Sequence, residues 1–205
     1  MIVYIILAFL VFVLNYLKQV YWFVKPALTN KSVDNIKNGI NEGKESSFTA
    51  IFILVLISGF RAYSVGLDLG NYLANFNAIA NNLTIKTGHG FEILFQSLNY
   101  WCALIFGNQV GFTVLLFIIS IIFAYSINQV IQKNSASFAL SFFLIITLGI
   151  YAQSFSALRQ ILALSVVLLS IKYIQQRNLF MFIFYIIIAI FFHKTAFIFF
   201  PVFFL

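Results

Sequence analysis

Long apolar stretches make up most of this 205-residue sequence and constrain its fold more than any other feature. Hydrophobic residues account for 62% of the chain and charged residues for only 8%, whereas soluble domains are about 25% charged. So few charged side chains cannot cover a soluble globule of this size. The mean hydropathy of +1.01 therefore predicts an all-α, polytopic transmembrane helical bundle within one integral-membrane domain, residues 1–205.

A helix needs about 20 apolar residues to cross a bilayer. The stretches that reach or approach this length are residues 2–24, 48–63, 111–131, 135–152, 156–174 and 179–192, and another run begins at Thr195. Nothing basic precedes the first stretch and no cleavage site follows it, so we expect a retained span and not a signal peptide. The last run stops at Leu205 without a polar flank, and we expect an N-terminal fragment of a longer protein.

Basic residues predict how these spans are oriented in a cell membrane. Four lysines lie within residues 25–47, and basic loops stay in the cytoplasm, so we expect this loop inside and the N-terminus outside. Lys133 and Lys172 mark two later loops. Placing both in the cytoplasm puts Arg159 and His193 near the outer side. This sorting also explains the net charge of +7 without a nucleic-acid partner.

Residues 64–110 must then begin and end on the outer side, as an outer loop with lateral helices. The apolar residues of 71–83 recur at helical spacing: Tyr72, Phe76, Ile79 and Leu83. This pattern predicts an amphipathic helix on the membrane surface. Residues 91–107 carry one polar-to-small stripe: Glu92, Gln96, Asn99 and Ala103. That stripe predicts a lateral or re-entrant helix. One more crossing is the alternative, and it would invert everything downstream.

Five ionisable residues lie in or beside the apolar stretches: Arg61, Asp68, Glu92, Arg159 and His193. Each costs about 2.5–3.5 kcal/mol to insert and is therefore a functional candidate. Arg159 shares one helix face with small and polar residues, so we expect it to point into the bundle. A guanidinium matches phosphate or carboxylate. The alternatives are snorkelling to the interface and an ion pair with Glu92 or Asp68.

The other candidates also admit two interpretations. Gly66 permits a tight turn and a close approach to a ligand between Arg61 and Asp68. The alternative there is a stop-transfer arginine and a solvated aspartate. His193 suits proton transfer if it lines a cavity, because an ordinary imidazole titrates near pH ~6.5, but an interfacial anchor is its alternative role. Glu92 is another candidate base, since burial raises the pKa of a carboxyl group.

The absence of several catalytic and metal-binding motifs limits the reactions that this sequence can support. The sequence has no P-loop, GxSxG or HExxH motif, one cysteine, and only two aspartates, so it has no Asp-x-Asp motif and we expect no metal site. Two arginines, two carboxylates and one histidine remain. That set suits a diphosphate leaving group, because cations offset the developing negative charge while one base accepts a proton.

Four segments occur in order along the sequence: FRAYSVGLDLGNY (60–72), EILF with a following LN (92–99), SALRQILA (156–163) and FHKTA (192–196) with Pro201. Together they resemble the EpsG family, the Wzy-like polymerases of bacterial exopolysaccharide and capsule. The family patterns that they resemble are FR…VGxDxxxY, EPLFxxLN, NxxRQxLA and FHxSAxxxLP. The departures are Leu67 for Thr, Ile93 for Pro, Ser156 for Asn and Thr195 for Ser.

The resemblance implies a metal-independent glycosyltransferase without a cofactor. It would transfer lipid-diphosphate-linked oligosaccharide to a sugar hydroxyl at the outer leaflet. The implied partners are undecaprenyl-diphosphate-linked oligosaccharide, the lipid bilayer and, as a candidate, a polysaccharide chain-length regulator. The implied roles are diphosphate binding for Arg61 and Arg159, base or substrate contact for His193, base or acceptor binding for Asp68 and Glu92, and substrate lining for Gln160 and Asn99.

Three other functions compete with this one. A flippase or transporter of lipid-linked oligosaccharide would also bury arginines in a cavity, although such proteins typically show internal repeats, which this sequence lacks. A membrane O-acyltransferase would use an intramembrane histidine. A non-catalytic subunit of a synthesis complex would need none of the candidate residues.

Overall fold

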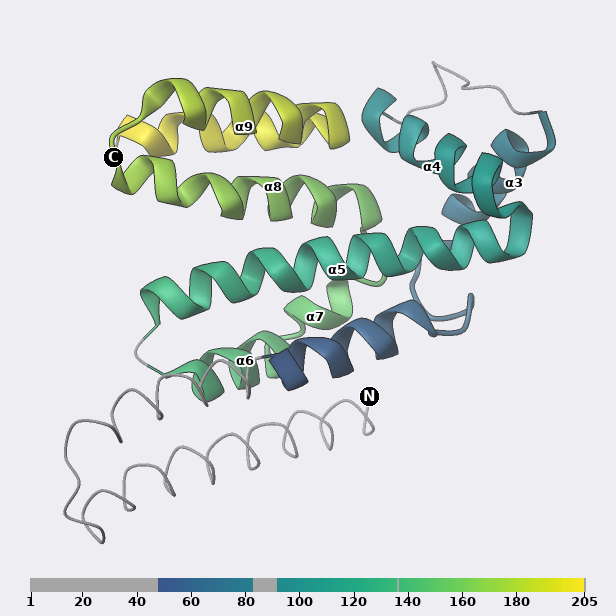
Figure 1. Cartoon of the computed structure of the whole chain (residues 1–205), viewed down its shortest axis with the longest axis horizontal. Coiled ribbons are helices and arrows are strands. Elements are labelled where there is room, and N and C mark those ends of the chain that lie inside the picture. Colours follow the sequence, from purple (N-terminus) through teal and green to yellow (C-terminus); the bar gives the residue numbers. More distant parts are fainter. Residues whose placement is uncertain (1–47, 83–91, 136, 205) are drawn as a thin grey trace, which may run out of the picture. The chain divides into compact units, whose positions relative to one another are not determined.

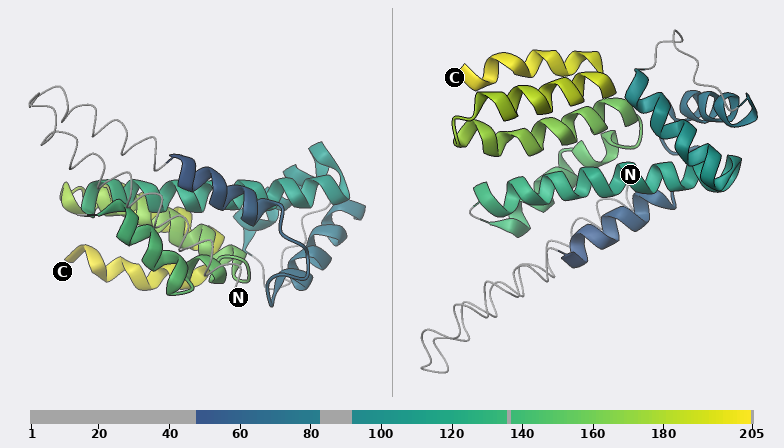
Figure 2. Two further views of the ribbon diagram at one scale, coloured as in Figure 1. Left: turned by 90° about the horizontal axis from the view of Figure 1, so that it is seen from below. Right: turned by 45° about the horizontal axis from the view of Figure 1, so that its top comes forward.

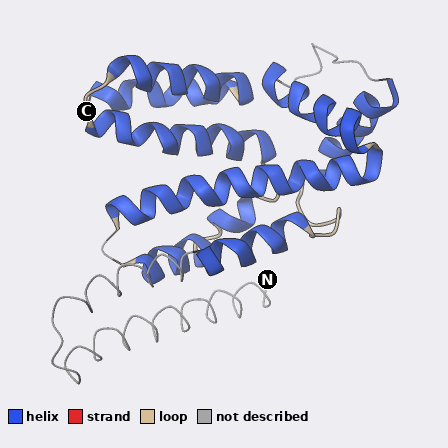
Figure 3. Cartoon of the chain, in the orientation of Figure 1, coloured by secondary structure: helices blue, strands red, loops and turns tan. Residues whose placement is uncertain are grey.

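The computed structural model of the protein describes residues 48–82, 92–135 and 137–204. The predicted first span (2–24), the predicted cytoplasmic loop (25–47) and Leu83 of the predicted helix 71–83 lie outside these residues. Every regular element in the described part is a helix, as Figure 3 shows, which confirms the all-α class there.

The helices follow one another along the chain as labelled in Figure 1. A first apolar helix covers Phe48–Gly59. It is followed by α3 (Leu69–Asn82), α4 (Ile93–Phe106), α5 (Asn108–Asn134), α6 (Phe138–Thr147), α7 (Ile150–Gln153), α8 (Leu158–Gln175), α9 (Leu179–Phe192) and the 3-10 helix η1 (Lys194–Phe204). Among the described helices, α5 and α8 are long and apolar enough to cross a membrane, and the others are shorter.

The described residues divide into two compact units. One holds residues 48–53 and 131–152, and the other holds residues 54–130 and 153–204. In the first unit, the stretch expected as one span over 135–152 is instead broken into α6 and α7. The break lies at Gly149, whose φ of 79° ends α6 in the left-handed region that glycine adopts without strain. All the candidate site residues belong to the second unit.

In the second unit, α3 and α4 pack against each other as amphipathic helices. Tyr72, Phe76 and Ile79 are buried on α3, as the spacing predicted. The stripe on α4 is buried too, and its Gln96 exchanges two amide hydrogen bonds of 3.3 Å with Asn75 of α3. The 14 residues of α4 rise about 21 Å, short of the ~30 Å hydrocarbon core. Its lateral placement stays a prediction.

A second group of helices in this unit consists of α8, α9 and η1, which lie side by side in Figure 1 and Figure 2. Their shared core is made of Ala163 and Val167 from α8, Phe182, Ile186 and Ala189 from α9, and Ala196 from η1. Small side chains at such contacts let apolar helices approach closely. The C-terminal apolar run therefore folds back along α9 as a 3-10 helix, and α9 also contacts α4.

The turn between residues 60 and 68 packs on the segment that leads into α8. Gly66 has a φ of +125°, and a Cβ there would clash with the carbonyl oxygen of Phe155. The next residue, Leu67, donates its backbone N–H to the hydroxyl of Ser156 over 3.0 Å. Gly66 thus makes the close approach expected for it, but here to the backbone at Phe155.

We predict that Gly66→Ala destabilises the protein by about 1–3 kcal/mol, because alanine at a positive φ is strained and its Cβ would push the turn off Phe155. Thermal unfolding of the detergent-purified protein measures the effect. Gly70→Ala is the matched control, since a Cβ at that position would meet nothing within 4 Å and α3 favours alanine. Equal unfolding temperatures for the two variants would contradict the prediction.

Candidate functional site

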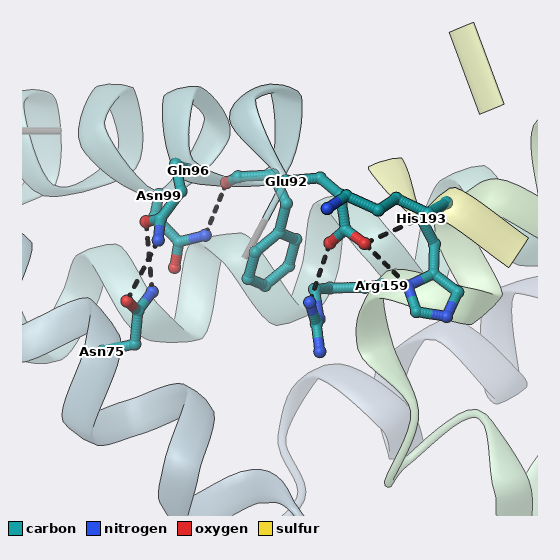
Figure 4. A network of polar contacts seen from close by, with 8 residues as sticks. Asn75, Glu92, Gln96, Asn99, Arg159 and His193 are labelled. Carbon is teal, nitrogen blue, oxygen red and sulfur yellow. Dashed lines mark hydrogen bonds and ion pairs between the residues drawn. The ribbon is translucent and has the colours of Figure 1, made fainter. Parts of the chain in front are cut away.

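Three of the four resembling segments meet at the carboxylate of Glu92 (Figure 4). Its Oε2 accepts a hydrogen bond of 2.8 Å from Nη1 of Arg159, 67 residues away in sequence. Its Oε1 lies 3.1 Å from Nδ1 of His193, 101 residues away, and accepts the backbone N–H of Lys194 over 3.2 Å. One side chain therefore joins the ends of α4, α8, α9 and η1.

Each of these residues stands where a helix begins or ends. Glu92 is the N-cap of α4 in extended backbone, and its side chain makes no capping bond to that helix. Arg159 is the second residue of α8, and His193 is the extended C-cap of α9. The side chains of Glu92, Arg159 and His193 are 8%, 20% and 14% exposed. The ion pair between Arg159 and Glu92, one of the alternatives considered for Arg159, is thus formed, and it is largely shielded from solvent.

The surroundings of Glu92 decide its charge. Burial by itself raises the pKa of the carboxyl group, but the backbone N–H groups of Glu92 and Lys194 and the guanidinium of Arg159 outweigh it, so the pKa is lowered from its ordinary value. From the sequence we expected burial to raise the pKa of the Glu92 carboxyl group and so to make it a candidate base. A carboxylate with a lowered pKa is instead a weak base and a strong hydrogen-bond acceptor.

Arg61 has neighbours of its own. It is buried, and its Nη1 donates to the carbonyl and the hydroxyl of Ser58 over 3.2 and 2.9 Å. Its Nη2 donates to the carbonyl of Phe155 over 3.4 Å, and the guanidinium lies 4.8 Å from the centroid of the Phe155 ring. Arg61 therefore ties the end of the helix Phe48–Gly59 to the segment before α8, four residues ahead of Arg159.

The side chains of the remaining predicted site residues make none of the described hydrogen bonds to Glu92, Arg159 or His193. Asp68 is exposed, and its backbone carbonyl accepts the N–H groups that begin α3. Gln160 is exposed on α8, beside Arg159. Asn99 is fully buried and donates to the carbonyl of Phe95 over 2.6 Å. Asn99 thus faces the interior, where we expected it to line the substrate.

Two groups at the site were not predicted from the sequence, the backbone N–H of Lys194 and the ring of Tyr72. The backbone N–H of Lys194 carries no side-chain signal, so no residue pattern could reveal it. Tyr72 was assigned only to the apolar face of α3, but the guanidinium of Arg159 lies 6.0 Å from the centroid of its ring, a cation–π distance. The terminal tyrosine of the first resembling segment was the available signal. Within the described residues, no group of three His, Cys, Asp or Glu side chains could hold a metal ion.

The lowered pKa of Glu92 predicts how stability responds to acid. The ionised carboxylate stabilises the fold fully above the ordinary glutamate pKa, and this contribution is lost as the pH falls through the lower, folded-state pKa. The stability difference between the wild type and Glu92→Gln should therefore be constant near neutral pH and shrink below about pH 4. Thermal unfolding at a series of pH values measures it.

Asp68→Asn is the control for this experiment, because its exposed carboxylate joins none of the described hydrogen bonds of the site. It should differ little from the wild type at every pH. A gap between the wild type and Glu92→Gln that does not change with pH would contradict the charge-based account of Glu92.

Similarity to known proteins identifies the family of the chain. No curated protein and no solved structure matches it. The model of the EpsG family matches residues 46–205, which include all four resembling segments and every residue of the site. This family implies a membrane setting and a role related to Wzy-like polysaccharide polymerisation. Because the match covers well over half of the sequence, the chain belongs to the EpsG family.

Proposed function

We propose that this protein is a membrane-embedded, metal-independent polymerase of bacterial exopolysaccharide or capsule. It transfers oligosaccharide from a lipid diphosphate to a sugar hydroxyl at the outer leaflet. Membership of the EpsG family supports the reaction class. The observation that carries the proposal to particular residues is the convergence of Arg159 and His193, from distant parts of the sequence, on Glu92.

Arg159 is the proposed ligand of the lipid diphosphate. A guanidinium presents its N–H donors in a planar fork that matches the geometry of phosphate oxygens. Arg159 also stands at the N-terminus of α8, where the helix dipole favours anions. Guanidinium and helix terminus together would offset the negative charge that develops as the diphosphate leaves. Arg61, tied to Phe155, would hold the same segment in place and so act on the diphosphate through it.

His193 is the proposed base. The acceptor hydroxyl forms a bond from its oxygen to the anomeric carbon, while the bond from that carbon to the diphosphate oxygen breaks. The bonding pair leaves with the lipid diphosphate, and the hydroxyl proton passes to the imidazole and then to water. Asp68 and Gln160, exposed on the same unit, are proposed for contacts with the acceptor sugar. A chain-length regulator is a proposed partner.

The test is Arg159→Ala in the native gene and its own bacterium, followed by analysis of the lipid-linked saccharides and their leaflet. Losing a charged donor to the leaving group should lower polymer synthesis by about 10²-fold or more. Single repeat units should accumulate on the outer leaflet, because flipping precedes the defect. Arg159→Lys should restore little, since an ammonium lacks the planar fork of the guanidinium.

Lys133→Ala removes an exposed cation outside the site and is the control. Repeat units stranded on the inner leaflet would identify a flippase, and an absolute need for an acyl donor would identify an O-acyltransferase. Unchanged polymer, with the variant protein present at normal levels, would leave Arg159 a structural residue and fit a non-catalytic subunit. Each of these three results would overturn the proposal.

A further inference from the structure

The partners of Glu92 restrict what its oxygen atoms can do. Nη1 of Arg159, 2.8 Å from Oε2, is a donor and never an acceptor. The backbone N–H of Lys194, 3.2 Å from Oε1, is likewise only a donor. An ionised carboxylate accepts at both oxygen atoms and so satisfies both partners. The lowered pKa of Glu92 agrees with this assignment.

The third partner is His193, whose Nδ1 lies 3.1 Å from the same Oε1 that accepts from Lys194. Two lone pairs facing each other at that distance would repel. A proton must therefore lie between them, and with Glu92 ionised that proton belongs to Nδ1. In a neutral imidazole one nitrogen carries the proton and the other accepts. The other nitrogen, Nε2, lies on the edge of the ring turned away from Glu92 (Figure 4).

We infer that Glu92 is a positioning residue that holds His193 in the tautomer protonated on Nδ1, which leaves the lone pair of Nε2 to take the proton of the acceptor hydroxyl. The acceptor's identity rests on the proposed function, whereas the tautomer rests on the contacts of Glu92 with a neutral imidazole. The role of Glu92 is then separate from that of the base. Its carboxylate also offsets the positive charge that the imidazole gains when Nε2 is protonated.

The sequence permits a direct test, because it contains only two histidines, His89 and His193. In a His89→Gln background, protein made with ¹⁵N-labelled histidine carries one labelled imidazole. The ring-nitrogen NMR spectrum in lipid bilayers at about pH 8, where an ordinary imidazole is neutral, distinguishes the two tautomers and the imidazolium. We expect the Nδ1–H tautomer to dominate. A dominant Nε2–H tautomer or an imidazolium would overturn the inference without any change at the site.

Two variants then separate charge from shape at Glu92. Glu92→Gln keeps the shape but offers one acceptor oxygen to three donors. That oxygen should turn to the cationic Arg159, because charge-assisted bonds are the stronger ones, and its NH₂ group should then face His193 and favour a lone pair on Nδ1. Glu92→Asp is shorter but still accepts at both oxygens. We therefore expect Glu92→Asp to retain more of the Nδ1–H tautomer than Glu92→Gln.

Polymer synthesis should follow the same order, with Glu92→Asp above Glu92→Gln. A role in packing alone predicts the reverse, since glutamine preserves the volume of glutamate and aspartate does not. The reverse order in the spectra of folded variants would overturn the inference. The two proposals fail separately: a wrong tautomer leaves the Arg159→Ala result untouched, and a failed Arg159→Ala prediction leaves the tautomer standing.

Discussion

One buried carboxylate holds the site-bearing unit together. Glu92 binds a guanidinium, an imidazole and a backbone N–H at once. The pair of Glu92 and Arg159 is partly buried, so removing one partner should cost less than the about 3–5 kcal/mol typical of a fully buried pair. Through these contacts the carboxylate joins the ends of four helices, α4, α8, α9 and η1. The apolar contacts among α8, α9 and η1 bury surface but contain no hydrogen bond or ion pair of this kind.

Much of the fold could be predicted from the sequence. The spacing of Tyr72, Phe76 and Ile79 predicted the buried face of α3, and the long apolar runs predicted α5 and α8 to within a few residues. These features follow from periodicity alone. The break at Gly149 and the 3-10 course of residues 194–204 could not be predicted, because hydropathy reports how apolar a run is and not where its backbone turns.

The sequence singled out the residues that meet in the candidate site, but it did not determine which contacts they make. Arg159, Glu92 and His193 stood out because ionisable residues are expensive in apolar stretches. An ion pair between Arg159 and Glu92 was one of the alternatives, and the structure forms it. The direction of the Glu92 pKa was missed, because it depends on a backbone N–H that no residue type encodes. The inward side of Asn99 was missed because a polar stripe does not say whether water or another helix covers it.

The contact between Glu92 and the main chain of Lys194 has a consequence for how variation at that position is interpreted. Any amino acid with a backbone N–H can make this bond, so the lysine side chain is replaceable there. Proline alone removes the donor. An alanine scan would thus class position 194 as silent, although its peptide group is one of the three supports of the carboxylate. This part of the site depends on the position of a backbone N–H group, so comparing side chains among related sequences does not reveal it.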